Sequence, residues 1–151
     1  MREVVRRVQG TGHVLKGGCA LVFAYGIRRH STDIDFDAAK PTDMTRRIRN
    51  GLRAAGAEMR SRELIRTRTS LRIRATYRVR GEGKEEMLKV DTRFRPKPVA
   101  AETVDVGGIL TNRPEALFEQ KLVALESRTV PRDLYDLEFI IGNYGDALTD
   151  R

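Results

Sequence analysis

The sequence has few of the features that cross-link or anchor a protein. Its 151 residues include one Cys, no Trp and only five Pro. A single cysteine excludes an internal disulfide bond and any zinc site built from several cysteines. The longest apolar run, residues 19–25, spans seven residues, whereas a membrane-spanning helix needs about 20. The N-terminal residues also lack the apolar stretch of a secretory signal. We therefore expect a soluble protein of the cytoplasm.

An ordinary hydrophobic content accompanies these absences. The chain is 40% hydrophobic and 33% charged, which is too apolar for a disordered protein. A chain of this length buries roughly 68–70% of the surface that it exposes when unfolded, so it needs no covalent or metal cross-link to fold. The length suits one domain, or one domain with a small appendage.

Positive charge is concentrated in the middle of the chain. The net charge is +8, yet residues 46–80 alone carry twelve Arg against two Glu. Within this segment, residues 71–80 alternate between apolar and mostly arginine positions, which predicts a half-buried β-strand. The apolar face holds Leu71, Ile73, Ala75, Tyr77 and Val79, and the other face holds Arg72, Arg74, Thr76, Arg78 and Arg80.

This arginine face has two interpretations. It is either an ordinary solvated strand face or a track for the backbone of a nucleic acid. Like charges on one strand face repel each other, and bound phosphates would relieve that repulsion. The guanidinium fork also suits phosphate better than a lysine does. Few aromatic residues interrupt the track, which favours recognition of backbone and shape over base stacking. The candidate nucleic-acid-binding residues are Arg66, Arg68, Arg72, Arg74, Arg78 and Arg80.

Apolar periodicity and turn residues predict an alternation of helices and strands. Thr42 or Asp43 is a plausible N-cap of the third helix. The expected helices cover residues 3–9, 19–25, 41–55, 113–128 and 131–141. The expected strands cover residues 13–15, 33–37, two stretches within 57–80, residues 87–94 and a short stretch within 99–106. This order predicts an α+β or α/β fold with a mixed sheet. We expect a core sheet domain over residues 1–110 and a helical segment over 111–151, or a single domain over the whole chain.

An acidic strand and a glycine turn are the most informative local features. Asp33 and Asp35 are two residues apart on a strand, so both carboxylates lie on one face, and Asp37 extends the row. Adjacent carboxylates repel, and a divalent cation between them relieves the repulsion. Oxygen ligands favour Mg²⁺ or Mn²⁺ over Zn²⁺. Asp91 lies between Lys89 and Arg93 on one face of its predicted strand. It is either a third metal ligand or a member of a surface ion pair.

Gly17 and Gly18 form a turn that leads into a helix, where free backbone N–H groups can bind phosphate. Taken singly, the glycine pair is also an ordinary turn, and the aspartates are also ordinary residues of an exposed strand. The glycine pair and the aspartates lie about 15 residues apart, with Arg28, Arg29 and Ser31 between them. This combination is more specific than either feature alone.

Four blocks of the sequence occur together in an order typical of one enzyme family. The blocks are residues 15–18 (LKGG), 31–36 (STDIDF), 89–91 (KVD) and 121–137, which contains KLVAL and RDLYDL. Over residues 13–141 the chain resembles the AbiEii-type nucleotidyltransferases, which are toxins of type IV toxin–antitoxin and abortive-infection systems, with the MenT toxins as relatives. The resemblance implies a polymerase-beta-like nucleotidyltransferase fold: a mixed sheet flanked by helices, with a short C-terminal pair of helices.

The resemblance also implies an activity and a set of site residues. Members bind a nucleoside triphosphate (NTP) with Mg²⁺ or Mn²⁺ and transfer a nucleotidyl group, in several cases to the acceptor end of a tRNA. We therefore expect an RNA acceptor, the 3′ end of a tRNA, and a cognate antitoxin as a partner. Nucleotide binding is expected of Lys16, Gly17, Gly18, Ser31, Lys121 and Arg128. Metal binding is expected of Asp33, Asp35 and Asp91, and catalysis of these three with Lys121 and Asp133. Asp133 is expected to orient Lys121 or Arg128.

One departure and three rival functions complete the sequence-based prediction. Relatives usually carry Thr or Ser after the two glycines, whereas this chain has Cys19, either a weaker phosphate ligand or a buried structural thiol. The rivals are a catalytically inactive RNA- or DNA-binding module, an enzyme that modifies a protein, and one that modifies a small molecule. Without the family, Lys121 is an ordinary solvated helix residue and Asp133 is explained by the helix dipole.

Overall fold

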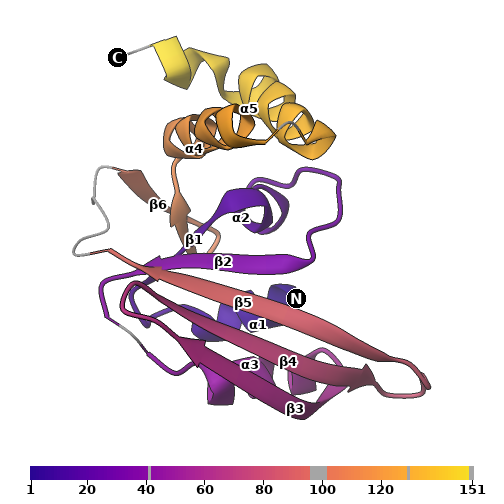
Figure 1. Ribbon diagram of the computed structural model, residues 1–151. Coiled ribbons are helices and arrows are strands. Elements are labelled where there is room, and N and C mark those ends of the chain that lie inside the picture. Colours follow the sequence, from indigo (N-terminus) through magenta and orange to yellow (C-terminus); the bar gives the residue numbers. More distant parts are fainter. Residues whose placement is uncertain (41, 96–101, 129, 150–151) are drawn as a thin grey trace.

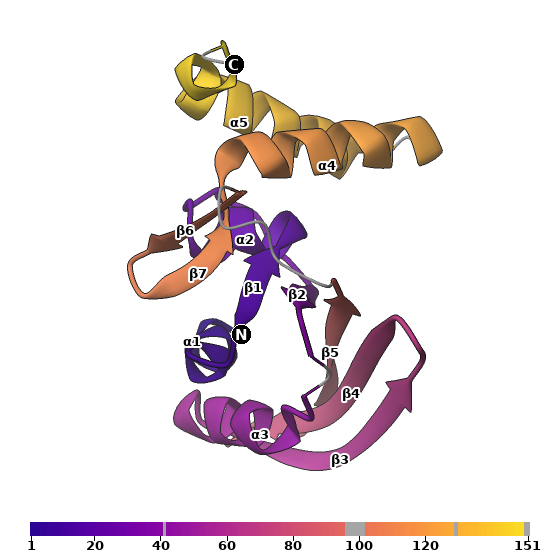
Figure 2. The same ribbon diagram turned by 90° about the vertical axis from the view of Figure 1, so that its left-hand side faces the viewer.

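The computed structural model describes residues 1–40, 42–95, 102–128 and 130–149. In both views α4 and α5 lie at one end of the molecule and α1 and α3 at the other, with β1, β2 and α2 between them (Figures 1 and 2). The helices are α1 (Arg2–Val8), α2 (Gly17–Phe23), α3 (Thr45–Ala54), α4 (Pro114–Ser127) and α5 (Pro131–Thr149). The strands are β1 (His13–Lys16), β2 (Asp33–Ala38), β3 (Ala57–Arg66), β4 (Ser70–Val79), β5 (Glu85–Phe94), β6 (Thr103–Val106) and β7 (Ile109–Asn112).

The strands form one mixed sheet, as predicted. Their order is β3-β4-β5-β2-β1-β7-β6. Strand β2 pairs antiparallel with β1 and parallel with β5, so it lies between elements from both halves of the sequence. The register sets Asp35 opposite Lys16 on one side and opposite Asp91 on the other. Because side chains at paired positions point to the same face of a sheet, these three share one face.

The other face of β2 carries the core. Ile34 and Phe36 are fully buried, as their positions between the aspartates predicted. They join apolar side chains of α1 and α3, including Ile48. The two helices cross closely at Gly51, where a Cβ atom would lie 2.5 Å from the Cα atom of Val4. This packing commits one face of the sheet to the core and leaves the charged face for other contacts.

Helix α3 starts later than predicted. It begins at Thr45, with Met44 as the N-cap residue, rather than at residue 41. Asp43 nevertheless caps the first turn, because its Oδ1 atom accepts hydrogen bonds from the backbone N–H of Thr45 at 2.8 Å and from its hydroxyl at 2.6 Å. Pro41, the predicted first residue, lies outside the described residues.

The segment before α4 contains one predicted strand and one that was not predicted. The short strand predicted within residues 99–106 is β6, which begins at Thr103, and residues 99–101 lie outside the described residues. Strand β7 was not predicted; it pairs with β6 and β1, and the expected domain boundary at residue 110 falls inside it.

Within the described parts of the chain, no helix combines the length and apolar character needed to cross a membrane.

Helix α5 is longer than predicted. It continues to Thr149 instead of ending near residue 141, with a kink at Tyr144 where φ is −138° and ψ is 20°. Gly142 and Gly145 lie in this extension, and glycine is a poor helix former. The ring of Tyr144 packs edge-on against Tyr25, at 5.4 Å between centroids, and against Phe139 at 6.2 Å. The kink thus divides α5 into two helical segments, and the ring contacts of Tyr144 lie at their junction.

His13 is a buried titratable side chain in this fold. It is 1% exposed, its Nδ1 atom lies 2.8 Å from the hydroxyl of Thr11, and its ring meets Phe36 edge-on. Its Nε2 atom has no hydrogen-bond partner among the described residues. Burial lowers the pKa of His13, and the nearby charge of Arg47 lowers it further.

This burial predicts a loss of stability in mild acid. The folded protein protonates His13 only at a lower pH than the unfolded chain, which does so near pH 6.5. Below that pH the unfolded state binds more protons, so the free energy of unfolding falls, by at most about 1.4 kcal/mol per pH unit for this one group. Urea unfolding at pH 7.5, 6.5 and 5.5 measures the fall. His13→Leu should show a smaller fall than the parent, and an equal fall in both would exclude His13 as the source.

Candidate active site

A cavity of about 740 Å³ opens between the charged face of the sheet and α4. One wall carries Asp35 and Asp91 together with the glycine turn, Gly17 and Gly18. The other wall carries residues of α4 and the position that follows it. The α4-side residues that line the cavity are Ala116, Glu119, Gln120, Lys121, Val123, Ala124 and Arg128. The cavity thus joins segments from both ends of the sequence.

Two carboxylates lie side by side on the sheet wall. Asp35 and Asp91 are register partners on parallel strands, which places their backbones about 4.8 Å apart. Burial raises the pKa of the Asp35 carboxyl, and the charge of Asp91 raises it further, while Lys16 acts in the opposite direction. No hydrogen bond or ion pair to the Asp35 carboxylate occurs in the described part of the chain. Asp35 is therefore an anionic group that faces the cavity without a paired cation.

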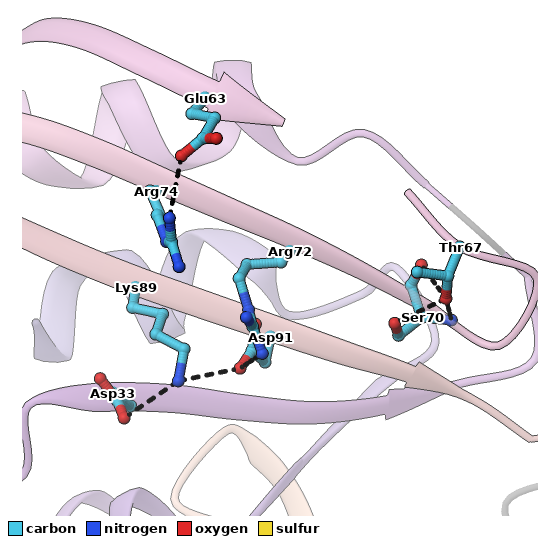
Figure 3. Close-up of polar contacts among 8 residues, drawn as sticks. All are labelled: Asp33, Glu63, Thr67, Ser70, Arg72, Arg74, Lys89 and Asp91. Carbon is cyan, nitrogen blue, oxygen red and sulfur yellow. Dashed lines mark hydrogen bonds and ion pairs between the residues drawn. The ribbon is translucent and has the colours of Figure 1, made fainter. Parts of the chain in front are cut away.

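Asp91 is held by two cations from the sheet (Figure 3). Arg72 donates from Nε to its Oδ1 atom at 2.6 Å and from Nη2 to its Oδ2 atom at 3.2 Å. The ammonium of Lys89 lies 3.2 Å from Oδ2 of Asp91 and 3.4 Å from Oδ2 of Asp33. Asp33, 43% exposed, thus faces Lys89. Within residues 1–40, 42–95, 102–128 and 130–149, no three His, Cys, Asp or Glu side chains gather closely enough to hold a metal ion.

The arginine face of β4 is largely neutralised by its own sheet. The alternation predicted for residues 71–80 is present, with Leu71 and Ile73 buried. Three arginines of the outer face pair with acids of β3 and β5, which relieves the repulsion expected among them. The pairs are Arg72 with Asp91, Arg74 with Glu63 at 3.2 Å and Arg78 with Glu85 at 3.0 Å.

The other three predicted arginines differ in position. Arg66 is the register partner of Leu71, so it lies on the opposite face of the sheet from Arg72. Arg68 lies in the turn that hydrogen bonds between Thr67 and Ser70 close (Figure 3), and Ser70 lines the cavity. Arg80 follows β4. In the described part of the chain, no ion pair involves Arg66, Arg68 or Arg80.

The glycine turn follows β1 directly. Gly17 has a φ of +64°, which side chains rarely adopt, and a Cβ atom there would lie 3.3 Å from Oδ2 of Asp35. The turn therefore brings its backbone against the sheet carboxylate, which only glycine permits without strain. Lys16, just before the turn, forms an ion pair with Asp37. Asp37 also contacts Arg95 and is 4% exposed, so it belongs to this ion pair network and not to the carboxylate pair.

Cys19 is the buried thiol that the sequence allowed as one of two interpretations. It is 1% exposed, donates from Sγ to the carbonyl oxygen of Lys16 at 3.0 Å and accepts from the backbone N–H of Asp35 at 3.3 Å. Burial raises the pKa of its thiol to about 12. Cys19 thus ties the end of β1 to β2 and does not line the cavity.

The α4 wall carries cations that form ion pairs with two aspartates of α5. The Lys121 ammonium lies 2.7 Å from Oδ1 of Asp133 and also contacts Oδ2 of Asp136. Arg128 Nε lies 3.3 Å from Oδ2 of Asp133. Burial acts against ionisation of Asp133, but Lys121 and Arg128 outweigh it and lower its pKa. Asp133 therefore contacts both of the cations that it was expected to orient.

Sequence reasoning missed two members of this group. Asp136 is fully buried, and both its oxygens accept hydrogen bonds from Arg29. Its position three residues after Asp133, on the same face of α5, could have identified it. Nothing in the sequence distinguishes Arg29 from its neighbour Arg28, and 107 positions separate Arg29 from Asp136.

The cavity collects some of the predicted site residues and leaves others outside. Ser31 forms a local hydrogen bond to the carbonyl oxygen of Asp33 at 3.1 Å. The predicted residues that line the cavity are Lys16, Gly17, Gly18, Asp35, Arg72, Asp91, Lys121 and Arg128. Those that do not line it are Ser31, Asp33, Arg66, Arg68, Arg74, Arg78, Arg80 and Asp133. Arg93, Arg95 and Glu102 line it without having been predicted.

Comparisons with known proteins agree with this architecture. The family model described as nucleotidyl transferase AbiEii toxin, type IV toxin–antitoxin system, matches residues 1–150. The crystal structure of JHP933 from Helicobacter pylori is similar, with 29% identity and a TM-score of 0.89 over 97% of this chain and 65% of that chain. A crystal structure of a candidate nucleotidyltransferase from H. pylori gives the same identity and TM-score over 97% of this chain and 67% of that one.

The chain thus spans about two thirds of the length of these two structures. No curated protein matches it. The match over nearly all of the sequence, together with the shared fold, shows that the chain belongs to the AbiEii family of nucleotidyl transferase toxins of type IV toxin–antitoxin systems.

Proposed function

We propose that the protein transfers a nucleotidyl group from an NTP to an RNA acceptor, the 3′ end of a tRNA. One observation carries the proposal: the carboxylates of Asp35 and Asp91 and the cations Lys121 and Arg128 line the same cavity. Nucleotidyl transfer needs both groups, because negative charge is present on the triphosphate and develops on the departing pyrophosphate.

The cationic wall is suited to the triphosphate. Lys121 and Arg128 both contact Asp133, which fixes their orientation. With Arg29 and Asp136 the group holds three cations against two acids, so positive charge remains. The backbone of the glycine turn lines the cavity as well, and its N–H groups are donors of the type that phosphate oxygens accept. A volume of about 740 Å³ lies within the range of small-molecule sites.

The carboxylate pair fits a divalent cation. Asp35 lacks a cation partner among the described residues, and its pKa is raised by burial and by Asp91, so a positive ion between the two would relieve their repulsion. We propose that Asp35 and Asp91 hold Mg²⁺ or Mn²⁺, ions that accept two carboxylates plus water and phosphate oxygens. Such an ion supplies Lewis-acid activation of the phosphate. Asp33 contributes as a third ligand only after it leaves Lys89.

The proposed reaction is an in-line displacement. The acceptor hydroxyl oxygen bonds to the α-phosphorus, the bond from that phosphorus to the bridging oxygen of the β-phosphate breaks, and pyrophosphate leaves. The hydroxyl proton passes to Asp91 or to water. Arg72 and Lys89 hold Asp91 in place, while Lys121 and Arg128 compensate the charge of the leaving pyrophosphate.

The site favours this function over its rivals. An inactive binding module has no use for two adjacent carboxylates in a half-buried cavity, since their repulsion destabilises the fold. A small cationic substrate fits poorly in a cavity whose lining carries six Lys and Arg side chains against four Asp and Glu. A protein acceptor is an outcome of the assay below. Because the family consists of toxins of toxin–antitoxin systems, we also propose a cognate antitoxin.

Labelling with α-labelled NTPs tests the function directly. The protein is incubated with each NTP, Mg²⁺ or Mn²⁺, and total cellular RNA. We expect label in a tRNA-sized band and a loss of more than about 100-fold in Asp35→Asn, since the variant removes a charge that acts on the reacting phosphate. Asp146→Asn, at an exposed position of α5, is the matched control and should label as the parent does.

The distribution of label decides among the functions. Label on protein alone would replace the RNA acceptor with a protein acceptor. No label with any NTP, despite measurable RNA binding, would support the inactive module. Label that persists in Asp35→Asn would contradict the site.

An arginine beside the cavity that forms no ion pair among the described residues predicts where RNA binds. Arg68 lies in the turn that leads to Ser70, and Ser70 lines the cavity. Arg68→Gln should weaken RNA binding and reduce the slope of log affinity against log salt by about 0.7–0.9 for each lost phosphate contact. NTP binding should be unchanged, because Arg68 does not line the cavity.

An arginine of α3 serves as the control. Arg49 is also exposed, but α3 packs its apolar residues into the core on the face of the sheet away from Asp35. Arg49→Gln should bind RNA as the parent does. An equal loss in Arg68→Gln and Arg49→Gln would mean that overall charge, and not an arginine beside the cavity, holds the RNA.

A further inference from the structure

Arg29, in the loop between α2 and β2, contacts the C-terminal helix α5. Arg29 donates from Nε and Nη2 to the two carboxylate oxygens of Asp136, at 2.6 and 2.7 Å, and from Nη1 to the carbonyl oxygen of His30 at 2.9 Å. Asp136 is fully buried, and the side chain of Arg29 is 10% exposed. This two-point contact fixes the orientation of both side chains.

Asp136 is shared with the cationic wall of the cavity. Its Oδ2 atom accepts from Arg29 and also contacts the ammonium of Lys121. Lys121 in turn contacts Asp133. A buried charge that loses its partner is strongly destabilised, so Arg29 and Lys121 keep their positions together. The position of the Lys121 ammonium therefore depends on a residue from the first quarter of the sequence.

The same guanidinium lies against the glycine turn. A Cβ atom at Gly18 would lie 2.1 Å from Nη2 of Arg29. An arginine tip usually moves aside at little cost, but this one is anchored to a buried carboxylate. Gly18 has no positive φ, unlike Gly17. The need for glycine at position 18 thus comes from the close approach of Arg29, not from backbone conformation.

Arg29 therefore connects two walls of the cavity without lining it. Gly18 belongs to the sheet wall and Lys121 to the α4 wall, and Arg29 contacts the first directly and the second through Asp136. Both views place α2 between the sheet and α4 (Figures 1 and 2). A rigid ion pair in this place sets the separation of the walls.

We propose that Arg29 is a positioning residue that sets the distance between the glycine turn and Lys121, so that both contact one triphosphate. The inference rests on the proposed function, since it takes the ligand of the cavity to be an NTP. Arg29 acts through the turn and through Asp136, and it touches neither the nucleotide nor the carboxylate pair.

A double-mutant cycle on the whole chain tests the proposal. The variants are Gly18→Ala, Arg29→Lys and their combination, with Arg28→Lys as the control at the exposed neighbouring position. Lysine keeps the charge near Asp136 but cannot make the two-point contact. Calorimetry measures the affinity for each of the four ribonucleoside triphosphates and for the corresponding monophosphate, and urea unfolding measures stability.

We expect each single variant to weaken binding of the preferred triphosphate by about tenfold, which is within the range of interaction free energies between contacting residues. The combination should be no weaker than Arg29→Lys alone, because the guanidinium that Gly18 accommodates is then gone. Monophosphate affinity should change less than about twofold, since a monophosphate does not span both walls. Arg28→Lys should bind as the parent does.

Four results would overturn the proposal. Equal losses for monophosphate and triphosphate, or unchanged affinities with reduced stability, would make Arg29 a purely structural residue. Multiplying losses in the combination would show that Gly18 and Arg29 act independently. A parent that binds none of the four triphosphates would overturn the proposed function itself, and the inference with it. If Arg29→Lys does not fold, Arg29→Gln/Asp136→Asn replaces the ion pair with a neutral hydrogen-bonded pair.

Discussion

The constraint on which the site depends is the side-by-side placement of two carboxylates in a sheet. The parallel pairing of β2 with β5 sets Asp35 opposite Asp91, and their repulsion has to be compensated by neighbouring cations. The compensation comes from both flanking strands. Arg72 reaches Asp91 from β4, and Lys16 acts on Asp35 from β1. The fold therefore supplies positive charge along the row, and it leaves Asp35 the least compensated member.

The two walls of the cavity use the same device with opposite signs. On the sheet wall, cations from neighbouring strands stabilise acidic groups that face the cavity. On the α4 wall, buried Asp133 and Asp136 stabilise cations that face it. On the sheet wall the counter-ions lie beside the acids, on the neighbouring strands. On the α4 wall the counter-ions are Asp133 and Asp136, which α5 supplies. Such prior pairing limits the reorganisation that a charged ligand would require.

Local patterns predicted what depends on local spacing. Alternation located β2 and β4 and their buried faces, because the period of a strand is fixed by its geometry. Pairings between distant residues were not accessible: the acids that neutralise Arg74 and Arg78 depend on strand register, and the contact of Arg29 with Asp136 joins residues 107 positions apart. Helix α5 continues beyond a kink at Tyr144, where the ring contact with Tyr25 joins residues that are far apart in the sequence. The family resemblance pointed to residues of both walls and to Asp133 as a partner of Lys121 and Arg128, but not to Arg29 and Asp136.

Cys19 shows how chemistry and packing separate at one position. Its side chain needs one donor and one acceptor, because it bonds the carbonyl of Lys16 and the N–H of Asp35. A hydroxyl offers the same pair of functions as a thiol. Serine or threonine at this position could therefore make the same two hydrogen bonds. Alanine or valine could make neither, and the backbone N–H of Asp35 would lose this contact with the end of β1.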